Sequence, residues 1–477
     1  MARNAHLIGI CGAGMSAVAH LLQEKGWTVT GSDEGAYPPV STYLEKIGLP
    51  VLVGHRPENI PESIDLIVIG KHAKLVPESN EEVRFALDQY RDKVKSFPEV
   101  LADLTTDRQR MVVAGSYGKS TLTTLITHCL AHAGKAPGWF IGAIPKGFDH
   151  SASTGGDGPF IFEGDEYPSA NWDDRSKFMH YRPGTVLLTS ATHDHVNIYP
   201  TLESYHAPFR TLLEELAERG GTLIASTDER YAAEFYRAFH GLKVSYGLEA
   251  GNDYSAANIT LGDPAAGEPT RFELVTGEET HTSFTTTELG RHAVQNICGA
   301  AAYLLGQNLL TPDELRDAVA AFQGLNRRLD RKATGSRLVI YEGFGSSYEK
   351  ARAAIEAIRE HYPGQRLIVM FEPHTFTWRN KAALSQYDTA FDDVDTVWLF
   401  APPTHGDASH DQASLADIHQ RTMAHHQDVR TFTADTMSEI LADATPDQNV
   451  ILVLSSGSFG GNLSGFLRNV EAQSPGR

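Results

Sequence analysis

The sequence predicts an α/β protein built from three domains. Its 477 residues are too many for one ordinary hydrophobic core. Short apolar strands alternate with helical segments, a pattern typical of parallel sheets covered by helices. The alternation restarts near residues 108 and 326, so we expect domains at 1–107, 108–325 and 326–477.

The first segment carries four expected strands, "HLIGIC", "WTVTGSD", "PVLVG" and "IDLIVIG". After the first strand, Gly12, Gly14 and Ala17 fit the dinucleotide fingerprint, and Asp33 ends the second strand near the required spacing. Alone, this pattern favours a nicotinamide-dependent dehydrogenase. The same glycine turn and helix end serve any diphosphate, and a tight turn without a ligand is a third interpretation.

The second segment opens with the strand "RMVVAG", the loop "AGSYGKST" and a helix ending near Gly134. The familiar phosphate loop has four residues between its glycines, whereas only Ser116 and Tyr117 separate Gly115 from Gly118. The turn still aims backbone N–H groups and a positive helix end at one point. Lys119 adds a cation there, and the alternative is a capped helix with a solvated lysine.

The strands "PFIFEGDE", "GTVLLTS" and "GTLIAS" follow, then an antiparallel stretch at 253–287 and helices at 291–306 and 312–322. Glu163, Asp165 and Glu166 end the first of these strands, and carboxylates beside a phosphate loop suit Mg²⁺. The alternative is a solvated acidic turn. In "SATHDHVNIYP", His193 and His195 lack a third zinc ligand at a fixed spacing, so a structural role is the default.

The third segment carries the strands "RLVIY", "RLIVMF", "DTVWLF" and "VILVLS". A flexible Ser/Gly loop at 455–461 follows the last strand, and it either binds an anion or simply turns. The motifs "GRHAVQN", "GLNRRLDR" and "EPHTFTWR" present cations that could equally be surface charge.

Composition limits the class of partner and the compartment. A formal charge of −19 argues against general nucleic-acid binding. The three widely spaced cysteines are typical of free thiols in a reducing compartment. The N-terminus runs straight into a strand and no apolar run reaches membrane length. We expect a cytoplasmic monomer or homodimer that binds neither nucleic acid nor membrane.

Together these motifs resemble the Mur ligase family over nearly the whole chain. The matching segments, in the family's order, are "HLIGICGAGMSAVAHLL", "GHRPENI", "AGSYGKST", "FEGDEY", "HDHVNIYPT", "GRHAVQN", "NRRLDR", "EPHTFT" and "LSSGSFGG". The resemblance implies a Rossmann-like UDP-sugar-binding domain at 1–107 and a central P-loop ATPase-like parallel sheet at 108–325. It implies a Rossmann-like C-terminal domain at 326–477 that binds the amine substrate.

The resemblance also implies a reaction. ATP phosphorylates the carboxylate of a UDP-linked N-acetylmuramic acid, and an amine then attacks the acyl phosphate to give an amide and phosphate. "YPPVSTYLE", "RSKF" and the closing Ser-Gly-Gly loop favour the branch whose amine is the tripeptide L-alanyl-γ-D-glutamyl-meso-diaminopimelate, in peptidoglycan synthesis or recycling. Positioning and charge neutralisation would dominate catalysis.

The family's functional residues map onto this sequence one by one. Lys119, Glu163 and His195 are the implied catalytic residues, with Mg²⁺ held by Ser120 and Glu163 and a second Mg²⁺ by His195. The implied ATP-binding residues are Gly115, Ser116, Gly118, Lys119, Ser120, Thr121, Asn296 and Arg328. The implied UDP-sugar residues are Gly12, Gly14, Met15, Ser16 and Asp33, and the implied amine-binding residues are His374, Ser455, Ser456 and Gly457.

One segment departs from the family pattern. The first strand of the C-terminal domain normally ends in Asp-Asp-aromatic-x-His-His-Pro. Here Glu342 and Gly343 replace the acidic pair, and residues 346–348 read Ser-Ser-Tyr. This segment leaves two alternatives open: a ligase repurposed for another carboxylate and amine, or a non-catalytic UDP-sugar-binding homologue.

Overall fold

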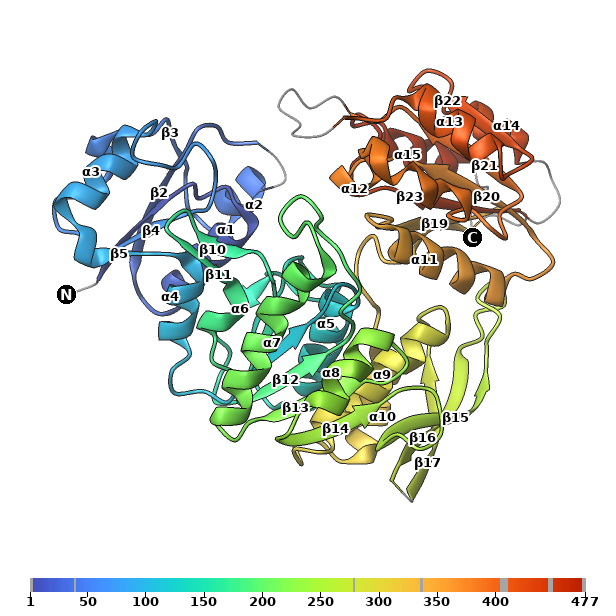
Figure 1. Ribbon diagram of the computed structural model, residues 1–477, viewed down its shortest axis with the longest axis horizontal. Helices are drawn as coiled ribbons and strands as arrows, with labels where there is room; N and C mark the ends of the chain where they lie inside the picture. Colours follow the sequence, from blue (N-terminus) through green and yellow to red (C-terminus); the bar gives the residue numbers. More distant parts are fainter. Residues whose placement is uncertain are drawn as a thin grey trace.

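Three separate sheets organise the protein, and a two-stranded hairpin accompanies them. The computed structural model describes residues 3–37, 40–277, 279–334, 338–403, 411–444 and 449–473. In Figure 1 the first unit (blue) and the last (orange) both lie against the central one (cyan to yellow). The sheets draw their strands from within 1–107, 108–325 and 326–477, and we keep these ranges as proposed domain limits.

The first sheet is entirely parallel. Its strands, in spatial order, are β3 (Leu52–Val53), β2 (Thr28–Asp33), β1 (Asn4–Ile8), β4 (Leu66–Ile69) and β5 (Val94–Lys95). Its helices are α1 (Ala13–Glu24), α2 (Val40–Lys46), α3 (Glu81–Gln89) and α4 (Phe97–Leu104), with 3-10 turns at Pro57–Asn59 and Arg91–Lys93. The four expected strands are confirmed, whereas the two-residue strand β5 was too short to give a pattern.

The central sheet has ten strands. They are, in spatial order, β17 (Glu279–Thr286), β16 (Thr270–Thr276), β15 (Tyr254–Thr260), β14 (Leu242–Tyr246), β13 (Thr222–Ser226), β12 (Thr185–Leu188), β6 (Arg110–Ala114), β9 (Phe160–Gly164), β7 (Gly138–Phe140) and β8 (Ala152–Ser153). The run from β15 to β7 is parallel. β15, β16 and β17 pair antiparallel, as the polar stretch at 253–287 predicts.

The helices of the central unit begin, with the exception of the short helix Lys177–His180, after a glycine or at a side-chain N-cap. They are α5 (Lys119–His132), α6 (Lys177–His180), α7 (Leu202–Glu218), α8 (Arg230–Ala238), α9 (Arg291–Leu304) and α10 (Pro312–Ala321). The hairpin of β10 (Pro168–Ala170) and β11 (Asp173–Ser176) projects toward the first unit, where the Lys71 ammonium donates to the Ala170 carbonyl at 3.1 Å. This hairpin was not predicted, because strands of three and four residues are too short to show a periodic pattern.

The third sheet is parallel except at one edge. Its strands, in spatial order, are β18 (Asp330–Thr334), β19 (Leu338–Gly343), β23 (Asn449–Leu454), β20 (Arg366–Phe371), β21 (Thr396–Phe400) and β22 (Val429–Phe432). Its helices are α11 (Tyr348–His361), α12 (Phe376–Arg379), α13 (Leu415–Met423), α14 (Glu439–Asp443) and α15 (Leu463–Gln473), with a 3-10 segment at Lys381–Asp388. The antiparallel edge strand β18 is polar and was not expected.

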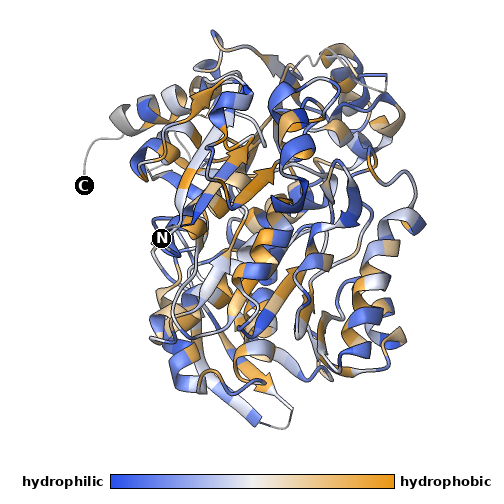
Figure 2. Cartoon of the chain, turned by 90° about the vertical axis from the view of Figure 1, so that its left-hand side faces the viewer, coloured by the Kyte–Doolittle hydropathy of each residue, from blue (hydrophilic) through white to orange (hydrophobic). Residues whose placement is uncertain are grey.

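Apolar spacing explains how these elements pack. In α5, Leu122, Leu125, Ile126 and Cys129 recur at intervals of three and four residues, and all are buried. The strands beneath are apolar on both faces, as parallel strands covered by helices require. Figure 2 shows the hydrophobic colour gathered on the interior strands, while the helices carry both colours.

Two strands mark the points where ligands bind in open α/β sheets. β1 lies between β2 and β4, and β6 lies between β12 and β9, so the chain continues to opposite sides of each strand. A crevice opens beyond the carboxyl end of such a strand. The glycine turn at 9–14 and the loop at 115–118 occupy these two places.

Candidate active site

The loop after β6 has a backbone that requires glycine. Gly115 has φ +141°, and a Cβ atom there would lie 2.2 Å from Thr189 Oγ1. Gly118 is left-handed at φ +82° and caps α5. The Ser116 and Tyr117 amides both donate to Ser190 Oγ at 3.0 Å. The amides that remain for a ligand are therefore those of the first turn of α5, which have no acceptor within the helix.

Lys119 and Glu166 form an ion pair beneath this loop. Lys119 Nζ lies 3.0 Å from Glu166 Oε2 and also donates to the Gly115 carbonyl. The Glu166 side chain is fully buried. Burial raises the pKa of Glu166, but Lys119 and His195 outweigh it and hold the pKa below its usual range. The pair keeps an ammonium fixed at the start of α5.

Ser120, in the first turn of α5, contacts Glu163 on the neighbouring strand β9. Ser120 Oγ donates to Glu163 Oε1 at 2.7 Å, and the Gly142 amide donates to Glu163 Oε2 at 2.8 Å. Two neighbouring ligands of an octahedral Mg²⁺ lie about 3.0 Å apart, since each metal–oxygen distance is about 2.1 Å. The two oxygens therefore fit one Mg²⁺ with little movement.

His195 lies on the other side of Glu166. Its Nε2 is 3.1 Å from Glu166 Oε1 and its Nδ1 is 2.8 Å from the Tyr167 hydroxyl. Both ring nitrogens are thus engaged, so a metal ion at His195 requires one of these partners to move. Among the described residues, no three His, Cys, Asp or Glu side chains gather as a metal site. Mg²⁺ commonly needs only one or two carboxylates, because phosphate and water oxygens complete its shell.

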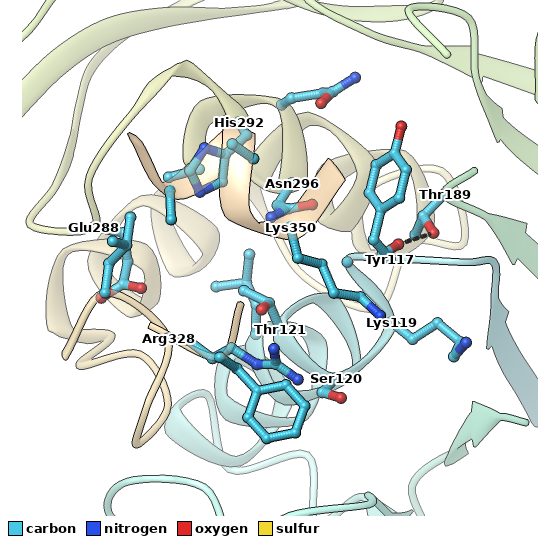
Figure 3. Close-up of a pocket in the computed structure, with 18 of the residues that line it drawn as sticks. Tyr117, Lys119, Ser120, Thr121, Thr189, Glu288, His292, Asn296, Arg328 and Lys350 are labelled. Carbon is cyan, nitrogen blue, oxygen red and sulfur yellow. Dashed lines mark hydrogen bonds between the residues drawn. The ribbon is translucent and has the colours of Figure 1, made fainter. Parts of the chain in front are cut away.

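These groups open onto a cavity of about 350 Å³ between the central and C-terminal units. Figure 3 shows its wall: Ser120 and Thr121 of α5, Asn296 of α9, and Arg328 from the segment joining the two units. The Arg328 guanidinium lies over the Phe344 ring at 4.4 Å. The predicted residues Ser116, Gly118, Lys119, Glu163 and His195 line the same cavity.

Three further residues of the cavity were missed in the sequence. Glu288 precedes α9, and burial raises the pKa of its carboxyl to about 7. His292 lies one turn before Asn296 on α9, and burial with the nearby His361 lowers its pKa to about 4. Lys350 comes from α11 of the C-terminal unit. The helical spacing of His292 and Asn296 was the one available signal.

The residues predicted for a UDP-sugar lie apart from this cavity, after β1. Asp33 accepts a hydrogen bond from the Cys11 amide at 2.9 Å. Met15 and Ser16 are buried, so their side chains offer little surface to a ligand. A Cβ atom at Gly14 would lie 3.0 Å from the Phe97 ring, so this glycine allows α1 to pack on α4.

The residues predicted for the amine converge at the carboxyl edge of the third sheet. Ser455 Oγ donates to Glu372 Oε2, and the Gly457 amide donates to Ser455 Oγ at 2.7 Å. Any Cβ at Gly457 would meet the His374 ring at 2.3 Å. Ser456 Oγ is buried and finds no hydrogen-bond partner among the described residues. None of these four predicted residues lines the cavity.

Arg327 ties this loop to the joining segment. Its Nε donates to Glu342 Oε1 at 2.7 Å, and its Nη2 donates to the Ser455 carbonyl at 3.0 Å. Glu342 also pairs with Lys332 at 3.1 Å. Glu342 is the acid that remains in residues 342–348, the segment that departs from the family pattern. Through Arg327 it links the joining segment to the 455–457 loop.

Comparison with known proteins identifies the family. Residues 4–109 match the Mur ligase family, catalytic domain, and residues 113–304 match the Mur ligase middle domain. A UDP-N-acetylmuramate–L-alanine ligase from a Roseiflexus species is 31% identical over 418 residues, covering 82% of this chain and 83% of the relative. The chain belongs to the Mur ligase family. Family members are ATP-dependent ligases that form amide bonds, and this membership replaces the dehydrogenase interpretation of the Gly12–Gly14 turn.

Longer but more distant matches cover nearly the whole chain. A UDP-N-acetylmuramate–L-alanyl-γ-D-glutamyl-meso-2,6-diaminoheptandioate ligase from Haemophilus influenzae is 28% identical, covering 96% of this chain and 97% of the relative. Its Escherichia coli namesake is also 28% identical, covering 98% and 99%. Both branches expected from the motifs are therefore present among the relatives.

Solved structures confirm the expected three-part α/β fold. The UDP-N-acetylmuramate–alanine ligase from Thermotoga maritima superposes with a TM-score of 0.76 at 19% identity, covering 98% of this chain and 99% of the other. A murein peptide ligase from Psychrobacter arcticus gives a TM-score of 0.66 at 23% identity, with the same coverage. No helix in the described ranges has the length and apolar character needed to cross a bilayer.

Proposed function

We propose that the protein joins the carboxylate of a UDP-linked N-acetylmuramic acid to the amino group of L-alanyl-γ-D-glutamyl-meso-diaminopimelate, in peptidoglycan synthesis or recycling. The full-length relatives from two bacteria whose names give this peptide support the choice. The observation that carries the proposal is the paired arrangement at the start of α5, where Lys119–Glu166 and Ser120–Glu163 lie side by side.

The reaction proceeds in two steps, formation of an acyl phosphate and its reaction with the amine. A carboxylate oxygen of the muramic acid attacks the γ-phosphorus of ATP, and ADP leaves. The peptide amine then attacks the acyl carbon, the C–O bond to phosphate breaks as the amide forms, and the departing phosphate takes up the proton that the amine loses. Lys119 and the first amides of α5 neutralise the phosphate charge, so the chain mainly positions the reactants.

Ser120 and Glu163 would hold Mg²⁺, with the charge neutralisation at phosphate oxygens that such an ion supplies. Glu166 keeps the Lys119 ammonium in place and orients the His195 ring by accepting from Nε2. His195 then faces the cavity beside the loop. Its proposed part as a ligand of a second ion requires Tyr167 or Glu166 to release it.

Each of the other two units would bind one substrate. The turn after β1 and Asp33 would bind the UDP group through the end of α1. The loop at 455–457 and His374 would face the incoming amine. The buried Ser456 hydroxyl has no hydrogen-bond partner within the described ranges, and this supports the assignment, because such a group gains a partner when a polar ligand binds.

The segment after β19 favours a second candidate, a ligase acting on a different acid and amine. Gly343 has no side chain where the family carries an acid, and Ser346 and Ser347 replace its histidine pair. The intact Lys119, Glu163 and Glu166 cluster argues against a protein that only binds a UDP-sugar.

The test is a matrix of acids and amines with the purified protein, ATP and Mg²⁺. We expect phosphate release only when UDP-N-acetylmuramic acid and the tripeptide are both present, with L-alanine far less effective. The mass of the product identifies the amide. Release with a non-muramic acid supports the second candidate, and binding of UDP-muramic acid without release under any condition supports the binding homologue.

A further inference from the structure

Lys350 extends from the C-terminal unit into the cavity. It lies in the first turn of α11, just after the altered segment, and Figure 3 shows its side chain running toward the start of α5. Its Nζ is 3.4 Å from Asp194 Oδ2 of the central unit, and the side chain is 22% exposed. It is thus a cation that one unit presents to the nucleotide site of another.

Among the described residues, few acceptors reach this ammonium. It carries three N–H donors, yet the described residues offer it one carboxylate, at 3.4 Å. Charge-assisted hydrogen bonds are normally about 2.7–2.9 Å long. Burial lowers the pKa of Lys350, and the charges of Lys119 and Arg328 lower it further, against the opposing effect of Asp194.

The position of Lys350 on α11 adds to the excess of positive charge near its ammonium. Lys350 follows Tyr348, the first residue of the helix, by two positions. The N-terminus of a helix carries a partial positive charge, which disfavours a cation and favours an anion. Lys119, Arg328 and the end of α11 therefore add positive charge on the cavity side of Lys350, whose carboxylate partner is Asp194. A polyanion placed among Lys119, Arg328 and Lys350 would stabilise all three cations.

We propose that Lys350 is a nucleotide-binding residue, supplied by the C-terminal unit, whose ammonium binds the β,γ-phosphate end of ATP opposite Lys119. The inference rests on the proposed function, because it takes ATP as the ligand of the cavity. It assigns to this chain a phosphate contact adjoining the segment where the acidic pair and histidines of the family are replaced. It also makes nucleotide binding a force that joins the two units.

The competing explanation is a purely structural ion pair with Asp194. The two differ in which ligand they affect. A phosphate contact matters for ATP but not for adenosine, whereas a structural pair affects both ligands, and thermal stability, together.

The experiment measures binding of a non-hydrolysable ATP analogue and of adenosine, each with Mg²⁺, to the full chain and its variants. For Lys350→Met we expect the analogue to bind about 10- to 100-fold more weakly, with adenosine affinity unchanged. Lys350→Arg retains the charge and should recover most of the affinity. Lys381→Met removes a half-exposed lysine of the same unit and is the matched control.

The outcomes separate the inference from the proposed function. If Lys350→Met binds the analogue as tightly as the wild type, or loses analogue and adenosine affinity equally, the inference is wrong. If the wild type binds the analogue but releases no phosphate with any acid and amine, the proposed ligase function is wrong. The proposed phosphate contact of Lys350 is then still supported by the weaker binding of Lys350→Met. A wild type that binds neither nucleotide overturns both.

Discussion

The segments that follow two strands, β6 and β19, meet at the proposed nucleotide cavity, and they are built differently. The loop after β6 draws its partners from within the central unit: Lys119 has Glu166 at 3.0 Å, and Ser120 has Glu163 at 2.7 Å. The segment after β19 has Gly343 in place of an acid, and its nearby Lys350 finds its carboxylate in another unit, at 3.4 Å.

The two sides of the site therefore differ in how far they are organised before a ligand binds. Groups held by short contacts inside one unit cost no reorganisation when charge develops, so they suit the phosphoryl-transfer step. Groups that meet across two units depend on domain closure, which substrate binding commonly drives. We therefore propose that the α5 side is a fixed half of the site and that ligand binding completes the α11 side.

Removing Lys119 should have the largest effect. Lys119→Met takes away the cation at the phosphate loop and leaves the buried Glu166 carboxylate without it. We expect kcat/KM for phosphate release to fall at least about 100-fold and the free energy of unfolding to fall by about 3–5 kcal/mol. Lys135→Met, at a half-exposed surface pair, is the control and should change neither. A Lys119→Met variant with wild-type activity would contradict the proposal that the α5 side neutralises the phosphate charge.

Replacing one glycine on each side with alanine compares how tightly the two segments are packed. Gly115→Ala puts a Cβ 2.2 Å from Thr189 Oγ1 on a backbone at φ +141°, so we expect a loss of at least about 3 kcal/mol in unfolding free energy. In Gly343→Ala the new Cβ would lie 2.9 Å from the end of the Leu454 side chain and at an ordinary 3.8 Å from two other side chains, so the change should cost about 1 kcal/mol. Denaturant unfolding measures both. Equal losses would contradict the contrast between the two segments.

Two carboxamide variants compare the acids. Glu166→Gln should lower kcat about 10-fold and stability by about 2 kcal/mol, because the ammonium of Lys119 loses its charged acceptor. Glu342→Gln weakens the pairs that this buried carboxylate makes with the partly exposed Arg327 and Lys332, so stability should fall by about 1 kcal/mol. Its main effect should be a higher KM for the amine, because Arg327 also holds Ser455. Steady-state kinetics with both substrates varied checks this split.

The smallest effect concerns pH. Burial raises the pKa of Glu288 from 4.5 to about 7, so folding disfavours its charged form. Its contribution to stability is greatest below pH 4.5, declines as the pH rises to about 7, and is constant above. Glu288→Gln should therefore gain about 1–2 kcal/mol relative to the wild type at pH 8 compared with pH 4.5. Glu279→Gln, at an exposed carboxylate, is the control.

Local patterns in the sequence predicted much of this molecule. The apolar strand Arg110–Ala114, the glycine turn and the following helix share one short stretch, and parallel-sheet logic brings Glu163 to the same edge. The strands β5 and β22 and the hairpin β10–β11 were missed, because short or polar strands leave little periodicity.

The side-chain pairings were beyond the sequence. Lys350 and Asp194 are 156 positions apart, and only the packing of two units brings them together. The choice of Glu166, rather than its neighbours, as partner of Lys119 depends on which carboxylate points inward. Gly14 fitted a ligand motif, and the absence of a Cβ there also leaves room for the Phe97 ring, which the sequence could not show.

The central claim, that ATP activates a carboxylate at the Lys119 turn, is tested most directly by isotope transfer. UDP-N-acetylmuramic acid labelled with ¹⁸O at both carboxylate oxygens is turned over with ATP and the tripeptide, and the released phosphate is analysed by mass spectrometry. The account predicts one ¹⁸O atom in each phosphate, because the acyl C–O bond breaks when the amide forms. Unlabelled phosphate, or pyrophosphate in its place, would contradict it.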